Sequence, residues 1–280
     1  MNLKITGFAD EIAPDLTTQM ESIKKLNISH IEMRGVDGNN LIFHNDEKVK
    51  EIKSRLDENG IRLSALGSPL GKIGILDSFE PHFEQYKKAV EIAHMMECRN
   101  IRMFSFYLPE EGAAADYEDE VFNRLSKMAE YAKNNEVVLL HENEKGIYGA
   151  KAAECKKIMD EFYSPYFKAI FDFANFVQCG ENTLEGYNIL KPYIDYIHVK
   201  DALLKDGTVV PAGYGDGHVK EILTDLFATG FDGFLSIEPH LGDFQGFEAL
   251  EKNVDSSKVK KLSGFEAFEL AHTSLLKCLG

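Results

Sequence analysis

Cysteine is scarce in this chain of 280 residues, and the four that occur are far apart: Cys98, Cys155, Cys179 and Cys278. They form no CxxC pair and no dense framework. The sequence therefore predicts neither a disulfide scaffold nor a zinc site built from thiolates, and reduced structural thiols are expected.

Basic residues are outnumbered, with 31 Lys and Arg against 46 Asp and Glu, which gives a formal net charge of −15. A field of this sign repels phosphates, so we expect neither nucleic acid nor an anionic membrane as a partner. No apolar run approaches the roughly 18 residues of a membrane span, and the acidic Asp10 and Glu11 come too early for a signal peptide. We expect a cytoplasmic enzyme.

The chain also lacks Pro- or Ser-rich linkers and low-complexity tracts, so residues 1–280 are expected to form a single domain. Strand-like apolar runs alternate with helical patterns along its whole length. The expected strands are residues 3–9, 28–35, 61–66, 100–106, 137–142, 167–173, 193–200 and 233–238. The expected helices are 14–26, 46–58, 79–96, 117–134, 152–162, 183–190, 218–229 and 265–279. Eight such units predict an α/β fold, a single (β/α)8 TIM barrel.

Four of the expected strands end in a side chain that can bind a metal: Glu142, Asp172, His198 and Glu238. They are separated by 30, 26 and 40 residues, close to what one strand, one helix and two loops consume. Alternate residues of a strand face opposite sides, and these four occupy the less apolar side. We therefore expect them to meet at the carboxyl-terminal mouth of the barrel, where such barrels keep their chemistry.

Three carboxylates and one imidazole suit Mn²⁺, Mg²⁺ or Co²⁺ and also tolerate Zn²⁺. Four protein ligands leave two octahedral positions for adjacent carbonyl and hydroxyl oxygens of a substrate. An ion held there can polarise the carbonyl and stabilise an enediolate oxygen after the α-proton has left. A buried salt bridge is the alternative for any one residue, whereas the shared strand phase of all four favours a metal site.

Further residues are candidates for substrate binding because of their strand side or their place in a loop: Lys200, His240, Glu32, Arg34, Ser68, Lys72 and His44. A surface ion pair with Asp201 is the alternative for Lys200, and a backbone cap is the alternative for His240. Glu32 and Arg34 share one side of the second strand and could instead form an internal ion pair. Ser68, Lys72 and His44 are expected in loops near the rim.

The chain resembles the xylose-isomerase-like TIM barrel superfamily, the sugar phosphate isomerase/epimerase family, over essentially its whole length. The matching pieces are Glu142, Asp172, the motif His198-Val199-Lys200-Asp201, Glu238-Pro239 and the loop Ala212-Gly213-Tyr214-Gly215-Asp216-Gly217. The resemblance implies a divalent ion, with manganese favoured, on Glu142, Asp172, His198 and Glu238. It also implies that Glu142 and Glu238 flank a small-molecule sugar as an acid/base pair. The sequence leaves a homo-oligomer open.

The predicted function is a metal-dependent isomerase or epimerase of a keto-sugar or related polyhydroxylated carbonyl compound, acting through a cis-enediolate. Asn175 stands where many ketose epimerases of the group carry histidine, which favours a keto-glycoside, an inosose or a sugar acid. An inosose-type dehydratase is the alternative within the same chemistry. An endonuclease-IV-like nuclease would need more histidines and a less acidic surface. A non-catalytic sugar-binding subunit would not need Glu142 and Glu238 intact.

Overall fold

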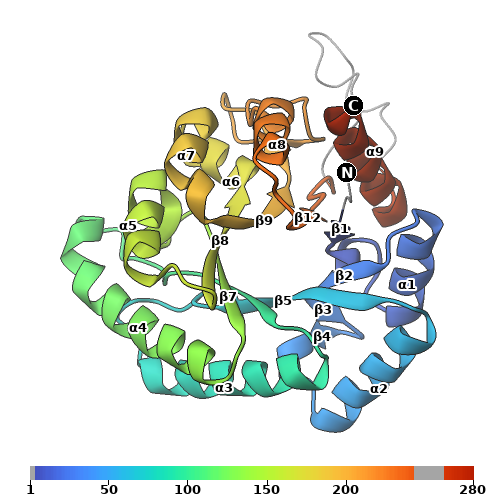
Figure 1. The fold of residues 1–280 in the computed structure, drawn as a ribbon, viewed down its shortest axis with the longest axis horizontal. Coiled ribbons are helices and arrows are strands. Elements are labelled where there is room, and N and C mark those ends of the chain that lie inside the picture. The colour runs from blue at the N-terminus through green and yellow to red at the C-terminus, as the bar shows by residue number, and fades with distance from the viewer. Residues whose placement is uncertain (1–3, 243–261) are drawn as a thin grey trace.

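A sheet of eight parallel strands forms the centre of the computed structural model, which describes residues 4–242 and 262–280. The strands follow the order β1-β12-β9-β8-β7-β6-β5-β2, and the two outer strands of that order, β1 and β2, contact each other. The sheet therefore curves into the nearly closed barrel seen in Figure 1, and the predicted TIM barrel is confirmed. The strands are β1 (Lys4–Gly7), β2 (His30–Met33), β5 (Arg62–Leu70), β6 (Asn100–Met103), β7 (Val138–Glu142), β8 (Phe167–Asp172), β9 (Ile194–Val199) and β12 (Phe234–Ile237).

Helices surround the sheet and follow the strands in turn (Figure 1). They are α1 (Leu16–Lys25), α2 (Asp46–Glu58), α3 (Phe79–Met95), α4 (Glu118–Asn134), α5 (Ala152–Phe162), α7 (Thr183–Leu190), α8 (Val219–Ala228) and α9 (Gly264–Leu279). Short polar side chains fix several of their first residues. Asp15 accepts a hydrogen bond from the backbone of Thr18 at the start of α1, and Asn45 does the same for Lys48 in α2. Each predicted helix is present.

The alternation of side chains divides the core into two layers, as the strand pattern predicts. Outward-facing residues such as Leu139, Ile197 and Leu235 join one large cluster with the buried faces of the helices. Inward-facing residues form a small separate cluster of Ala65, Val138, Leu140, Ile170 and Tyr196 inside the barrel. Glu142 lies on the same side of β7 as Val138 and Leu140, so the strand carries its last side chain into the barrel.

Strand β5 is longer than expected because it continues through Gly67-Ser68-Pro69, which the sequence predicted to be a loop. Its pairing with β6 changes register between Leu66 and Leu70. The Ser68 hydroxyl donates to the Arg102 carbonyl and so satisfies an acceptor near this irregularity. The strand ends at Leu70 and is followed by Gly71, whose φ is +87° and whose added Cβ would lie 2.0 Å from the Phe104 carbonyl oxygen. Only glycine fits this close turn.

Small elements that the sequence did not predict add to the barrel. The hairpin β3 (Gly35–Val36) and β4 (Asn39–Asn40) follows β2, and β10 (Asp201–Ala202) pairs with β11 (Val209–Val210) after β9. The short helix α6 (Phe173–Gln178) begins directly after Asp172. These additions all lie beyond the carboxyl-terminal ends of strands, where they bring extra backbone groups close to the predicted site.

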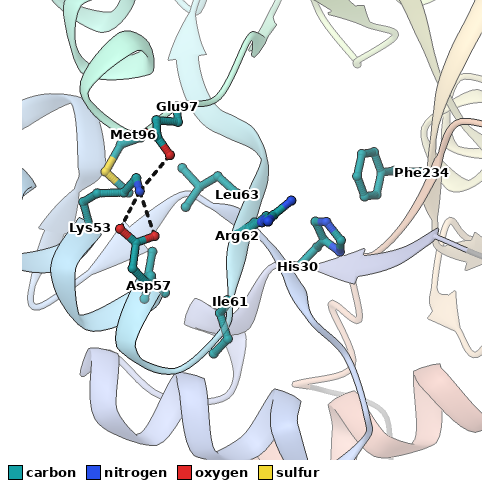
Figure 2. Close-up of a pocket in the computed structure, with 10 residues that line it drawn as sticks. His30, Lys53, Asp57, Ile61, Arg62, Leu63, Met96, Glu97 and Phe234 are labelled. Atoms are coloured by element: carbon teal, nitrogen blue, oxygen red, sulfur yellow. Dashed lines mark hydrogen bonds and ion pairs between the residues drawn. The ribbon is translucent and has the colours of Figure 1, made fainter.

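A cavity of about 490 Å³ lies at the opposite, amino-terminal end of the barrel. His30, Arg62 and Phe234, the first residues of β2, β5 and β12, line it. Figure 2 shows Lys53 at its side, paired with Asp57 and Glu97 at 2.6 and 3.0 Å. None of the predicted site residues contributes to its wall in the described part of the chain. Among the described residues, no helix combines the length and apolarity that a membrane span requires.

Candidate metal centre

The four predicted ligands converge at the carboxyl-terminal mouth of the barrel. Glu142 and Asp172 are the last residues of β7 and β8, His198 is next to last in β9, and Glu238 follows β12 directly. One candidate ligand atom from each lies within 4.8 Å of the others, and all four side chains are buried. Because β12, β9, β8 and β7 are neighbours in this order, the four residues form an arc with Glu238 and Glu142 at its two ends.

Asp172 presents one of its two carboxylate oxygens to the centre of this arc. Its Oδ1 accepts a hydrogen bond of 2.8 Å from the backbone of Asn175 and so caps helix α6. Its Oδ2 is buried and accepts no hydrogen bond among the described residues, although the Lys200 ammonium group lies 3.2 Å away. A buried carboxylate oxygen is costly unless a cation faces it. An oxygen that no hydrogen bond holds in place fits a divalent ion.

His198 is oriented by a carboxylate on the far side of its ring. Its Nε2 lies 3.1 Å from Oε2 of Glu32, and its Nδ1 lies 2.9 Å from Oε1 of Glu142. When Nε2–H donates to Glu32, the neutral ring leaves its Nδ1 lone pair for a cation, an arrangement common around metal-bound histidines. Glu32 also accepts from Tyr196 and Ser236, at 2.9 and 2.6 Å. It is fully buried behind His198 and does not reach the rim.

Each terminal glutamate of the arc uses one oxygen to pair with an arginine. Arg102 lies 3.3 Å from Oε2 of Glu142, and Arg34 lies 3.2 Å from Oε1 of Glu238. Both guanidinium groups pack on the ring of Phe8, at 4.6 Å for Arg34 and 4.8 Å for Arg102. The pairing leaves Oε1 of Glu142 and Oε2 of Glu238 directed to the interior cluster. One oxygen of each glutamate thus pairs with an arginine, while the other contacts His198 in the case of Glu142 and Lys200 in the case of Glu238.

Lys200, which follows β9, reaches the same cluster. Its ammonium group lies 2.9 Å from Oε2 of Glu238 and 3.2 Å from Oδ2 of Asp172. The side chain is 4% exposed, so these are buried ion pairs rather than the surface pair with Asp201 that the sequence left open. Lys200 is therefore part of the centre.

The surrounding charges set the protonation of the metal-free centre. Burial favours a neutral Glu142, but His198 and Arg102 outweigh it and lower its pKa to about 2. Burial likewise opposes the charged forms of Glu238 and His198, yet Lys200 lowers the pKa of Glu238 well below its usual value, and Glu142 raises that of His198 well above it. The ring would therefore release a proton on metal binding.

Asp172 differs from the other carboxylates. Burial raises its pKa to about 7, because Lys200 only partly offsets burial and because Glu238 and Glu142 add like charge. A bound cation would favour the ionised form of Asp172 and displace the proton on the His198 ring.

The remaining candidate residues lie at different depths around the centre. His240 lies 3.2 Å from Oε1 of Glu238 and adopts a positive φ of 45°, which is uncommon outside glycine. Lys72 pairs with Glu144 at 3.1 Å. Ser68 is buried in β5 rather than in a rim loop. His44 contacts the Val36 carbonyl at 2.8 Å, away from the four ligands.

Several residues of the centre were missed by the sequence reasoning. Arg102 is an isolated charge inside the apolar run of β6, a signal that could have identified it. Glu11 lies 3.3 Å from both Arg34 and His240, although its acidity was used only to exclude a signal peptide. Asn143 follows Glu142 and makes two hydrogen bonds to the backbone of Asp172, which fixes the ends of β7 and β8 relative to each other.

The glycine-rich loop after the histidine motif wraps around the carboxylate of Asp201. That carboxylate accepts hydrogen bonds from the backbone of Ala202, Gly213, Gly215 and Gly217, at 2.9 to 3.0 Å. An added Cβ at Gly215 would lie 2.4 Å from Oδ1 of Asp201. Gly215 and Gly217 are required because the backbone comes this close to the acid, and Gly213 adopts a positive φ of 83°.

Comparison with known proteins identifies the family to which this chain belongs. A family model described as xylose isomerase-like TIM barrel matches residues 20–259. The chain belongs to this family. The 3-dehydroshikimate dehydratase of Bacillus anthracis is 21% identical over 172 residues, which cover 61% of each chain. The chain spans only 49% and 61% of the lengths of the curated relatives that it matches.

Solved structures share the fold over nearly the whole chain. A D-tagatose 3-epimerase-like protein superposes with a TM-score of 0.74 at 19% identity, covering 99% of this chain and 98% of that protein. The IOLI protein with a bound zinc atom gives the same TM-score and coverage at 15% identity. At these identities the likeness establishes the fold, and the fold's neighbours include both epimerase-like and dehydratase proteins.

Proposed function

We propose that this protein is a divalent-metal-dependent isomerase or epimerase that moves a proton next to the carbonyl of a polyhydroxylated small molecule. The observation that carries the proposal is the buried arc of Glu142, Asp172, His198 and Glu238, in which Oδ2 of Asp172 accepts no hydrogen bond in the described structure. These four residues would hold the ion. A bound ion would polarise the carbonyl of the substrate and offset negative charge that develops on it. Manganese is favoured by the three oxygen ligands, and zinc is bound by a structural neighbour.

Glu142 and Glu238 are the residues that would move the proton. They stand at opposite ends of the arc, so a substrate lying over His198 and Asp172 would have one glutamate on each side. Arg102 and Arg34 each hold one oxygen and so orient the two carboxylates, and an oxygen that is not bound to the ion would take or return the proton. Return to the opposite face gives epimerisation, and return to the neighbouring carbon gives isomerisation.

Dehydration is the second candidate, because a curated relative is a 3-dehydroshikimate dehydratase. In that reaction the same glutamate removes the α-proton, and the β-hydroxyl leaves as water after accepting a proton from the second glutamate. Three cationic side chains, Arg34, Arg102 and Lys200, surround the centre and would also favour a substrate that carries a carboxylate. Product mass separates the two candidates, since only dehydration loses water.

Deuterium exchange tests the proposal directly. The protein is incubated in D₂O with Mn²⁺ and a panel of keto-sugars, keto-glycosides, inososes and cyclic keto acids, and carbon-bound deuterium is measured by mass spectrometry and NMR. We expect exchange with one class of compound, and loss of exchange in Glu142→Gln and Glu238→Gln. Glu144→Gln is the matched control, because Glu144 pairs with Lys72 and not with the four ligands.

Two outcomes would contradict the proposal. If the wild-type protein binds no divalent ion, the assignment of the four ligands is wrong. If it binds the ion and Glu142→Gln and Glu238→Gln exchange deuterium as fast as wild type, these glutamates do not move the proton.

A further inference from the structure

Lys200 occupies a place that a metal-binding site would not ordinarily give to a cation. Its ammonium group touches two of the oxygens that face the centre, Oε2 of Glu238 and Oδ2 of Asp172, at 2.9 and 3.2 Å. Each of these two oxygens is also 3.9 Å from Nδ1 of His198, the remaining nitrogen donor. The ammonium group thus lies among the groups that would hold the ion.

The other acids of the centre each face a cationic or imidazole group besides Lys200. Glu142 lies beside Arg102 and His198, Glu32 lies beside His198, and Glu238 lies beside Arg34, which also pairs with Asp10 and Glu11. Asp172 has no arginine partner in the described structure, and Lys200 is the cation that faces it. Removing one partner of a buried pair leaves an uncompensated charge, which is strongly destabilising. Lys200 therefore keeps the acidic centre together when no metal is bound.

The two kinds of cation at the centre differ in where they bind. Arg102 and Arg34 hold the outer oxygens of their glutamates, so an ion among the inner oxygens would not displace them. Lys200 holds inner oxygens. A divalent ion and an ammonium group on the same two oxygens repel each other strongly at a separation of a few ångström. The lysine side chain has a flexible four-carbon stem and can move away, whereas its backbone stays at the end of β9.

We propose that Lys200 is the counter-ion of the metal-free centre, that it competes with the divalent ion for the Asp172 and Glu238 oxygens, and that metal binding releases its ammonium group toward the substrate. This inference rests on the proposed function, because it takes the four residues as the metal ligands. Released from the carboxylates, Lys200 supplies a buried positive donor to a carboxylate or hydroxyl oxygen of the substrate. Metal occupancy thereby creates a substrate contact that the metal-free protein lacks.

Metal affinity of a Lys200→Met variant tests the competition without any substrate. Mn²⁺ and Zn²⁺ are titrated against a chromophoric chelator in mildly alkaline buffer. We expect the variant to bind at least about tenfold more tightly than wild type, because a unit charge a few ångström from the ion is removed. Lys72→Met is the matched control: it deletes the same charge from a lysine that pairs with Glu144, a residue outside the ligand set, and its affinity should stay within about twofold of wild type.

Thermal unfolding provides a second readout on the same variant. Lys200→Met should unfold at a lower temperature than wild type without metal, and addition of the ion should stabilise it more than it stabilises wild type. Affinity equal to or weaker than wild type, with an equal response of the unfolding temperature to metal, would overturn the inference. Absence of metal binding by wild type would instead overturn the proposed function.

The wild-type protein supplies a measurement that does not depend on the variant folding. Lysine amines are labelled by reductive methylation with and without Zn²⁺, and the extent of labelling at Lys200 is determined by peptide mass spectrometry. Burial and two ion pairs should protect Lys200 in the metal-free protein, and Zn²⁺ should increase its labelling several-fold while Lys72 remains unchanged. Labelling of Lys200 that is unchanged or reduced by Zn²⁺ would contradict its release.

Discussion

Glutamine in place of Glu32 should weaken metal binding although Glu32 is not itself one of the proposed ligands. The Glu32 carboxylate accepts hydrogen bonds from Tyr196, Ser236 and Nε2 of His198. Glutamine has nearly the same volume, but it replaces one acceptor oxygen by an NH₂ donor. All three donors bond to Oε2, and Nε2 of His198 also lies 3.3 Å from Oε1, so even a glutamine whose oxygen occupies the Oε2 position loses the negative charge and places its NH₂ beside Nε2. A neutral partner with a donor beside Nε2 favours the tautomer that carries the proton on Nδ1, the nitrogen directed to the centre.

The magnitude follows from these contacts. Hydrogen bonds to a charged group contribute about 1.5 to 3 kcal/mol each, and loss of the residue that orients a metal-bound histidine typically costs 10- to 100-fold in metal affinity. We therefore expect Glu32→Gln to raise the Kd for Mn²⁺ or Zn²⁺ by about 10- to 100-fold. A competitive titration with a chelator of known affinity measures the change, and circular dichroism verifies that the barrel remains folded.

Tyr196→Phe is the matched control for this prediction. It removes the hydroxyl that donates to Glu32 at 2.9 Å but leaves the carboxylate to orient His198. Metal affinity should change by less than about threefold, well below the expected effect of Glu32→Gln. If Glu32→Gln is folded and binds the ion as tightly as wild type, the ring of His198 does not depend on Glu32, and the reasoning is refuted.

Three further predictions concern stability. Burial lowers the pKa of His82 to about 4, so the unfolded chain takes up the proton first and stability falls as pH drops below about 6.5. Between pH 7 and pH 5, protonation of this residue in the unfolded chain should lower the free energy of unfolding, measured in urea, by about 2 kcal/mol. The His82→Gln variant should not show this loss, because glutamine does not titrate and can still accept the hydrogen bond from the Gly71 backbone. If the variant has the same pH dependence as wild type, the prediction is refuted. Gly71→Ala should lower the free energy of unfolding by roughly 3 kcal/mol or more. Gly60→Ala should lower it by only about 1 kcal/mol, because φ is also positive there but no atom lies close to the added Cβ. Equal losses in the two variants would contradict the steric argument. Asp201→Asn should cost about 1 to 3 kcal/mol, because an amide cannot accept all four backbone N–H groups, and unchanged unfolding in urea would count against that role.

The fold was predictable because its signals are local and repeated. Eight apolar runs of strand length alternate with helical patterns, and side-chain alternation within β7, β8 and β9 correctly placed Glu142, Asp172 and His198 inside the barrel. The prediction was wrong at Gly67-Ser68-Pro69, a sequence typical of turns that nevertheless continues β5. There the pairing with β6 and the hydrogen bond from Ser68 to the Arg102 carbonyl override the local preference.

The partners of the site residues were harder to predict, because they come from distant parts of the chain. Nothing near Arg102 in the sequence indicates that its guanidinium group will contact Glu142, 40 residues away, and pack on the ring of Phe8. The place of Lys200 also required coordinates, since its strand side is compatible with a substrate contact, an ion pair at the surface or the buried pairs that it makes. The alternation of residues along a strand predicts the face of the sheet to which a side chain points, whereas the residue that it contacts depends on three-dimensional packing.

The ring of backbone amides around Asp201 has a consequence for protein engineering. Gly213, Gly215 and Gly217 donate to this one acid, which lies close after the strand that carries His198. A loop transplanted here from another protein to alter substrate preference would have to contain glycines at the same positions. Without them Asp201 would lose its hydrogen-bond donors, and the neighbouring side chains of His198 and Lys200 would be disturbed. Loop exchange in this scaffold is therefore best designed as a cassette that begins at residue 198 and ends at residue 217.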